Sequence, residues 1–430
     1  MMLSCQKQVF SLPPELHYLN CAYMSPLSKA VEAAGVEAVR RKRVPTAIVP
    51  EDFFDGPARV RERFARLVGA PDPRRVAVIP SASYGLATAA RNVKVRRGQN
   101  VVVSGEQFPS NVYPWRRLAR DRGLELRVIA APDRREGRGA EWNARLLEAV
   151  DRDTAVVALP HVHWTDGTRF DLERIGERAR SFGAALIVDG TQSVGALPFD
   201  VERIRPDALV CAGYKWLMGP YSIGVAYFGP VFDDGVPLEE SWTGREGSED
   251  FRGLVNYRDA YRPGAARFDV GESGNFALVP MLVAALDQLL AWGVPAIQDY
   301  CRELTRGLLE RAASYGFTAE DEAWRASHLF GLRAPDGLDL ERIAGALAER
   351  NVSVSVRGSS LRVSPHVYND EADVAALEDA LAAVVAGARH PAATTAAARR
   401  PRRSADDTSG ASPGSHGPRR AGGTPAGGGA

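Results

Sequence analysis

One lysine, Lys215, stands in a run that carries no other charge. The run from Ala208 to Phe232 is rich in Val, Leu, Ile and Ala, although 25% of the chain's residues are charged. Burial disfavours the protonated form of an amine, and a neutral lysine beside a carbonyl group forms a Schiff base. The other interpretation is a surface lysine in a loop between two buried strands. Other motifs must decide between the two.

An aspartate stands in a comparable position. Asp189 ends the apolar run ALIVD, and a carboxylate buried behind four apolar residues is costly unless it has a partner. It would serve either as the N-cap of a following helix or as the partner of a cationic group. Since Lys215 ends or follows a later strand, the two side chains could flank one ligand.

The third motif is SASYG, from Ser81 to Gly85, between a predicted strand and a predicted helix. Hydroxyl and backbone N–H groups at a helix N-terminus form an anion site, although serine at such a junction also serves as a plain N-cap. Lysine, aspartate and anion site together meet the needs of pyridoxal phosphate. They would hold its aldehyde, keep its pyridine nitrogen protonated and bind its phosphate.

The elements that must position these residues alternate from about residue 75. Short apolar runs predict strands, and the runs between them predict helices. The strands are expected at 75–80, 100–104, 124–130, 154–162, 184–190, 208–213 and 223–228, and the helices at 84–93, 112–123, 141–150 and 171–183. This alternation predicts an α/β fold with a mostly parallel central sheet covered by helices on both faces. In such sheets ligands bind beyond the carboxyl ends of the strands.

We predict four parts along the chain. An N-terminal segment (1–45) precedes a large cofactor-binding domain (46–290), a smaller α+β C-terminal domain (291–388) and a tail (389–430). The tail is rich in Ala, Gly, Pro and Ser and has no large apolar residue after its start, so we predict that it is disordered.

Composition limits the partners. The formal net charge is +1, which argues against a nucleic-acid or membrane partner. No signal peptide is apparent, and a cytoplasmic location is expected. The cysteines have no metal or redox spacing, and His161 and His163 lack a third ligand, so no metal site is predicted.

The stretch from Ile187 to Pro220 resembles the class V aminotransferase group of fold-type-I pyridoxal phosphate enzymes. This group includes cysteine desulfurases, cysteine C–S lyases, kynureninases and isopenicillin N epimerases. Its pattern is Asp-x-x-Gln followed by an aromatic residue or His before the Lys, here Asp189, Gln192, Tyr214 and Lys215. The resemblance extends over roughly residues 18 to 385 and implies the fold-type-I fold with pyridoxal 5'-phosphate as the cofactor.

The resemblance also implies roles for the residues around the cofactor. Ser83 and the backbone of Ala82 would bind the phosphate, and Phe108 would stack on the ring. Gln192 would donate a hydrogen bond to the phenolate oxygen. Trp164 stands where desulfurases have an Asn that contacts the cofactor.

Further matches concern the substrate and a second subunit. Tyr214 replaces a His that binds phosphate, and Arg362 matches the arginine that pairs with the substrate α-carboxylate. Glu272 or Ser273 would reach the phosphate of a neighbouring subunit. Such shared sites imply a homodimer.

The reaction predicted is β-elimination by a C–S lyase acting on a small L-amino acid. A desulfurase needs a cysteine shortly before the carboxylate arginine, and residues 351–364 contain none. The four cysteines, Cys5, Cys21, Cys211 and Cys301, are expected to take no part. An aminotransferase and an amino-acid epimerase are the alternatives among enzymes, and a pyridoxal phosphate-binding regulator is the alternative outside them.

Overall fold

The computed structural model describes residues 3–389, and the backbone alone at 387–389. The last helix ends at Arg389. Arg389, the first residue of the tail predicted to be disordered, is thus helical, and the rest of that tail lies outside the described part of the chain.

Seven strands form the central sheet, in the order β2-β8-β7-β6-β5-β3-β4. The pairs among β3, β4, β5, β6 and β7 are parallel, whereas β8 runs antiparallel to both β7 and β2. The strands are Val76–Ile79 (β2), Asn100–Ser104 (β3), Glu125–Ile129 (β4), Thr154–Pro160 (β5), Ala185–Asp189 (β6), Ala208–Ala212 (β7) and Gly224–Phe228 (β8). The predicted α/β fold with a mostly parallel sheet is confirmed.

Helices cover both faces of this sheet, which explains why its inner strands are apolar on both sides. Leu86 and Trp115 pack with Val101 on one face. Trp142 packs in the core cluster of the other face, which includes Val102. The helices of this part are Lys29–Arg41 (α1), Asp52–Leu67 (α2), Ala82–Asn92 (α3), Tyr113–Arg122 (α4), Arg138–Ala149 (α5), Leu172–Ser181 (α6) and Val201–Ile204 (α7).

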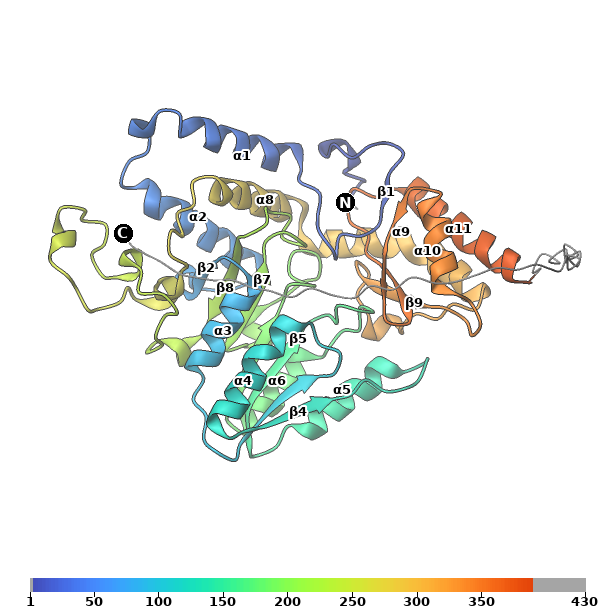
Figure 1. Cartoon of the computed structure of the whole chain (residues 1–430), viewed down its shortest axis with the longest axis horizontal. Coiled ribbons are helices and arrows are strands. Elements are labelled where there is room, and N and C mark those ends of the chain that lie inside the picture. Colours follow the sequence, from blue (N-terminus) through green and yellow to red (C-terminus); the bar gives the residue numbers. More distant parts are fainter. Residues whose placement is uncertain (1–2, 390–430) are drawn as a thin grey trace, which may run out of the picture. The chain divides into compact units, whose positions relative to one another are not determined.

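Two further helices meet at a sharp bend. Helix α8 (Leu278–Trp292) packs against α1 and α2 (Figure 1). Gly293, with φ of +80°, ends it, and α9 (Val294–Ser314) begins with Pro295 in its first turn. No single helix in the described part of the chain is long and apolar enough to cross a membrane, but α8 and α9 together, bent by 70°, meet those limits of length and composition.

The C-terminal part contains a second, smaller sheet (Figure 1). Its three antiparallel strands have the order β11-β12-β9. The N-terminal strand β1 pairs in parallel with β10 in this same region. The remaining elements are His17–Tyr18 (β1), Phe330–Arg333 (β9), Leu340–Ala348 (α10), Val352–Ser353 (β10), Ser355–Arg357 (β11), Ser360–Val363 (β12) and Glu371–Arg389 (α11). The first residues of the chain thus join its last strands.

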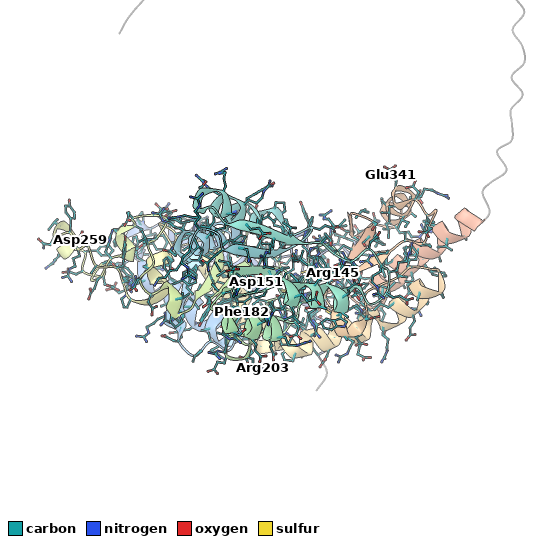
Figure 2. All side chains as sticks on the ribbon, turned by 90° about the horizontal axis from the view of Figure 1, so that it is seen from below. Arg145, Asp151, Phe182, Arg203, Asp259 and Glu341 are labelled. Carbon is teal, nitrogen blue, oxygen red and sulfur yellow. The ribbon has the colours of Figure 1, made fainter. Side chains whose placement is uncertain are left out.

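The segment from 245 to 276 has no α-helix and no strand. Asp259 lies at one end of the molecule's described part (Figure 2). Nearby, Tyr257 is 96% exposed and Val255 is 77% exposed. Long segments of this kind are commonly functional.

Candidate active site

A pocket of about 290 Å³ opens where the central strands end. The last residues of β5, β6 and β7 line it, together with the start of α3. It therefore lies at the carboxyl edge of the parallel strands, as expected. The predicted site residues that line it are Ala82, Ser83, Phe108, Trp164, Asp189, Gln192, Tyr214 and Lys215.

Lys215 follows β7 in a turn and is only 7% exposed. Its Nζ lies 5.4 Å from the ring centroid of Phe108 and 5.7 Å from that of Tyr214. Burial, followed by the charge of Arg362, lowers the pKa of Lys215 to about 8, against the opposing charge of Asp189. The surface-lysine interpretation is therefore wrong, and an appreciable fraction of this amine is neutral near pH 8.

Asp189 is the last residue of β6 and is 6% exposed. Its Oδ1 accepts a hydrogen bond from the Thr191 backbone N–H at 3.0 Å. Within the described residues, no Lys, Arg or His nitrogen lies within 4 Å of this carboxylate. Burial raises its pKa, against the Thr191 bonds and the charge of Lys215. Such a carboxylate suits a cationic ligand atom better than the N-cap role, since the next helix begins only at Val201.

The amide of Gln192 is oriented by its neighbours. The Trp216 indole N–H donates to Gln192 Oε1 at 2.9 Å. Gln192 Nε2 donates to the Ala22 carbonyl at 3.1 Å. Because the oxygen is fixed by Trp216, the amide presents its NH₂ group as the donor. That arrangement suits a negatively charged oxygen in the pocket.

The N-terminus of α3 forms one end of the pocket. Ser81 is the N-cap, and its Oγ accepts from the Tyr84 N–H at 3.2 Å. Ser83 Oγ donates to Ser110 Oγ at 2.9 Å, and both residues line the pocket. The first N–H groups of a helix have no partner within the helix. Capping and anion binding, which the sequence left as alternatives, are thus compatible here.

Two aromatic rings form a wall beside Lys215. Phe108 and Trp164 meet edge to face, with centroids 5.4 Å apart and planes at 83°. The Trp164 Nε1 donates to the Glu106 carbonyl at 2.7 Å. This bond fixes the indole, which presents a rigid apolar surface to the pocket.

Arg362 lies directly behind this wall and is 2% exposed. One terminal nitrogen donates to the Trp164 carbonyl at 2.9 Å and the other to Ser355 Oγ at 3.3 Å. Its buried Nε has no partner among the described residues, and no carboxylate there pairs with it. Burial, followed by the charge of Arg357, lowers its pKa to about 10. A buried guanidinium without an anion is suited to binding a carboxylate.

These groups fit pyridoxal phosphate. Lys215 would hold the aldehyde carbon, Asp189 the pyridine nitrogen and Gln192 the phenolate oxygen, and Phe108 would lie against the ring. The α3 N-terminus with Ser83 would hold the phosphate. The buried and unpaired carboxylate of Asp189 is the observation that supports the fit, since a protonated pyridine supplies the missing cation.

Comparison with known proteins agrees with this geometry. The model of the family "Aminotransferase class-V" matches residues 50–377. The chain belongs to this family. It is accordingly an enzyme that uses pyridoxal phosphate, and the regulator alternative does not apply.

Individual relatives differ in their reactions. Isopenicillin N epimerase of Streptomyces clavuligerus is 28% identical over 393 residues, which cover 87% of this chain and 96% of the epimerase. The cysteine desulfurase of Thermococcus onnurineus NA1 superposes with a TM-score of 0.77 at 22% identity, covering 90% of this chain and 99% of that one. The cystine C–S lyase C-DES, solved with its product cysteine persulfide, has a TM-score of 0.77 at 19% identity over 86% and 98% of the two chains. At these identities the two structures establish the shared fold alone.

Glu272 and Ser273 do not line the pocket of their own chain. Glu272 has φ of +61° in a turn. Ser273 is buried. Burial raises the pKa of Asp269, and Ser273 is among the groups that oppose this shift. Their role in a neighbouring subunit's site, implied by the class V resemblance, stays a prediction.

Several pocket residues were not predicted. Those in the lining are Pro80, Gln107, Ser110, Pro160, Val162, Thr191, Ala212, Tyr221, Ser222 and Ile223. Ser110 and Thr191 stand two residues after Phe108 and Asp189, so that their spacing within the same motifs was the available signal. Cys21 is among the groups close enough to Lys215 to influence its pKa, although the sequence placed it outside the site. No local pattern connects it with a lysine so distant in the chain.

The two histidines of the HVH motif have structural partners. His163 is fully buried, with Nδ1 2.8 Å from Thr165 Oγ1 and Nε2 3.2 Å from the Gly105 carbonyl oxygen. His161 packs edge to face on Phe199. Among the described residues no group of three His, Cys, Asp or Glu side chains could hold a metal ion.

Proposed function

We propose that this class V enzyme catalyses β-elimination from a small L-amino acid whose side chain is attached through sulfur, without a persulfide-carrying cysteine. One observation carries the proposal. The pocket contains a buried amine, Lys215, whose pKa is about 8, and no cysteine lines the pocket within the described residues. The site thus offers a base for the Cα proton and no thiol to receive sulfur.

Each of the following residues would have its own role in this reaction. Arg362 binds the substrate α-carboxylate, with Nε as the guanidinium nitrogen that has no partner among the described residues, and the Trp164 wall limits how the side chain can lie. Lys215 Nζ would act as the base that removes the proton from Cα of the bound substrate. Pyridoxal phosphate, when bound, supplies the ring that accepts the electrons of this bond. Asp189 keeps a proton on the pyridine nitrogen.

The bond between Cβ and sulfur then breaks, and the sulfur leaves with the electron pair as a thiolate. Water releases the remaining three carbons as pyruvate and the nitrogen as ammonia. This sequence needs no oxidant and no second keto acid. It also needs no enzyme thiol.

The state of the four cysteines supports elimination over persulfide transfer. Cys21 and Cys301 are fully buried and Cys211 is 1% exposed. Burial raises the pKa of Cys21 to about 12 and raises that of Cys211 well above its usual value. Cys5 is partly exposed, but its thiol lies 3.5 Å from the Asn369 carbonyl oxygen and outside the pocket. A sulfur-accepting cysteine must instead be an accessible thiolate.

Epimerisation is the second candidate, favoured by the identity shared with the epimerase over almost its whole length. Reprotonation of Cα from the opposite face normally needs a second acid. The titratable side chains that line the pocket, besides Lys215, are Asp189, Tyr214 and Tyr221. Burial raises the pKa of Tyr214, and its ring packs on Tyr221 at 4.6 Å. A raised pKa keeps Tyr214 protonated, so Tyr214 is the pocket side chain that would serve as this second acid if the enzyme were an epimerase.

The test uses purified holoenzyme. A panel of L-amino acids should give pyruvate and ammonia only from those with a β-thio substituent, and the variant without any cysteine should retain turnover. Borohydride reduction should fix the cofactor to the peptide that contains Lys215. Alanine as the main product, with turnover lost in one cysteine variant, would establish a desulfurase instead. Loss of optical activity without pyruvate would establish the epimerase, and a keto acid with the full carbon skeleton the aminotransferase.

A further inference from the structure

A second arginine shares the hairpin face that presents Arg362. Strands β11 and β12 pair with Ser355 opposite Arg362 and Arg357 opposite Ser360. Alternate residues of a strand share a face, so Arg357 lies on the same face as Ser355 and Arg362. The hydrogen bond between Arg362 and Ser355 Oγ identifies this face as the one behind Trp164.

Arg357 reaches the other end of the same tryptophan. Its guanidinium carbon lies 5.8 Å from the Trp164 ring centroid. After burial, which is the main cause, the charge of Arg357 contributes to lowering the pKa values of both Lys215 and Arg362. Three cationic side chains are therefore grouped around Trp164, and their mutual repulsion favours an anion between them.

The space beyond Trp164 is open. A cleft of about 1060 Å³ shares Trp164 and Gln107 with the pocket that contains Lys215, and Arg357 lines it. Trp164 and Gln107 are thus the residues that a substrate side chain would pass to reach this cleft.

The other arginines of the cleft already have acidic partners. Arg138 and Arg333 pair with Asp166, Arg135 pairs with Asp336 at 2.5 Å, and Arg134 pairs with Glu141 at 2.9 Å. Arg357, in contrast, has no carboxylate within 4 Å in the described residues, and its one hydrogen bond is to the Val356 carbonyl at 2.8 Å. Its remaining N–H donors are free to bind a ligand.

We propose that Arg357 binds a carboxylate at the far end of the substrate side chain, so that the substrate is an α-amino acid whose leaving group is itself acidic. The inference rests on the proposed function, which places the amine at Lys215 and the α-carboxylate at Arg362. Under it the two arginines hold the two ends of one dicarboxylic substrate on either side of Trp164.

Matched pairs of ligands, tested on the holoenzyme, show whether Arg357 binds a distal carboxylate. L-Glutamate and L-glutamine differ in the distal charge alone, as do S-carboxymethyl-L-cysteine and S-carbamoylmethyl-L-cysteine. Dissociation constants come from the absorbance change of the bound cofactor. The acid of each pair should bind at least about tenfold more tightly than the amide, as a charge-assisted pair would give. Arg357→Gln should bring the ratio of the two dissociation constants close to one, and Arg357→Lys should restore part of the preference for the acid.

Two further variants show whether the preference for the acid depends on Arg357 alone. Arg135→Gln removes an arginine of the same cleft that already has a partner, and it should keep the wild-type ratio. Arg362→Gln should weaken acid and amide alike. An acid-to-amide ratio near one in the wild type, or a ratio that survives in Arg357→Gln, overturns the inference while leaving the proposed function standing. If no amino acid of either kind perturbs the cofactor, the proposed function fails and this inference with it.

Discussion

Burying Lys215 imposes a free-energy cost on the protein when the cofactor is absent. The amine has a pKa of about 8 in the fold against an ordinary 10.5, so folding below pH 8 must either expel a proton or bury a charge. A shift of this size corresponds to about 3 kcal/mol. Between pH 8 and 10.5 the unfolded chain binds more protons than the folded one, so stability rises with pH in that window.

We therefore expect Lys215→Met to stabilise the cofactor-free protein at pH 7 by up to about 3 kcal/mol, since methionine fills a similar volume without charge. The advantage should shrink as the pH rises towards 10.5. Urea unfolding at pH 7 and at pH 9.5 measures both effects. The same change at the exposed Lys94 serves as the control and should show no such pH dependence. A Lys215→Met variant less stable than the wild type at pH 7 would mean that the amine is not desolvated.

At this scale much of the site could be predicted from the sequence. Asp189, Gln192 and Lys215 lie within 27 residues of one another, and each stands in an apolar or turn setting that already reveals its burial. Cys21 and Arg357 could not be placed in this way. Cys21 follows β1, which pairs with a strand more than 330 positions away, and Arg357 comes near the site through the contact of its hairpin with Trp164.

At the scale of elements, the turn after β6 links the cofactor residues to the core. Gly195 lies in this turn with φ of +106°, and a Cβ on it would meet the Trp216 carbonyl oxygen at 2.1 Å. Trp216 in turn orients the Gln192 amide. The glycine thus allows the chain after Asp189 to lie directly against the chain after Lys215.

Gly195→Ala should consequently lower the free energy of unfolding by much more than backbone strain alone would. Gly183 is the matched control, because it also has positive φ, +74°, but a Cβ there meets nothing within 4 Å. Gly183→Ala should lose roughly 1–2 kcal/mol of stability, the strain of a left-handed residue. Gly195→Ala should lose several kcal/mol, as overpacking against backbone does, and should also weaken cofactor binding. Thermal unfolding and cofactor titration measure the two effects, and equal losses in the two variants would contradict the argument.

The strands were predicted within a few residues because their apolar runs are short and bounded by polar turns. The elements around these strands were harder to predict from the sequence. The bend between α8 and α9 follows from Gly293 and Pro295, yet no helix was predicted for the run after Gly293. The pairing of β1 with β10 joins residues more than 330 positions apart, and two-residue strands leave no periodic signal.

On the scale of the whole molecule, the segment from 245 to 276 remains without an assigned role in its own chain. It exposes Val255 and Tyr257, and Trp242 beside it is 39% exposed. Exposed apolar side chains grouped on one segment commonly mark an interface. The homodimer predicted from the class V resemblance would cover them, and Glu272 would then reach the neighbouring site. The homodimer, the domain boundaries and the cytoplasmic location stay predictions.

Mixing two inactive variants tests the shared site. Lys215→Ala removes the base, and Glu272→Ala removes the residue predicted to act in the partner's pocket. If the sites are shared, a mixed dimer holds one pocket with both residues intact, contributed by different chains. Random exchange makes half of the dimers mixed, so unfolding and refolding the two variants together should restore about a quarter of the wild-type turnover, by the symmetry of a two-fold interface. Refolding each variant alone is the control and should restore nothing. If the mixture is as inactive as its components although sedimentation shows dimers, or if Glu272→Ala alone keeps full turnover, then Glu272 does not complete the neighbouring pocket and each site is built from one chain.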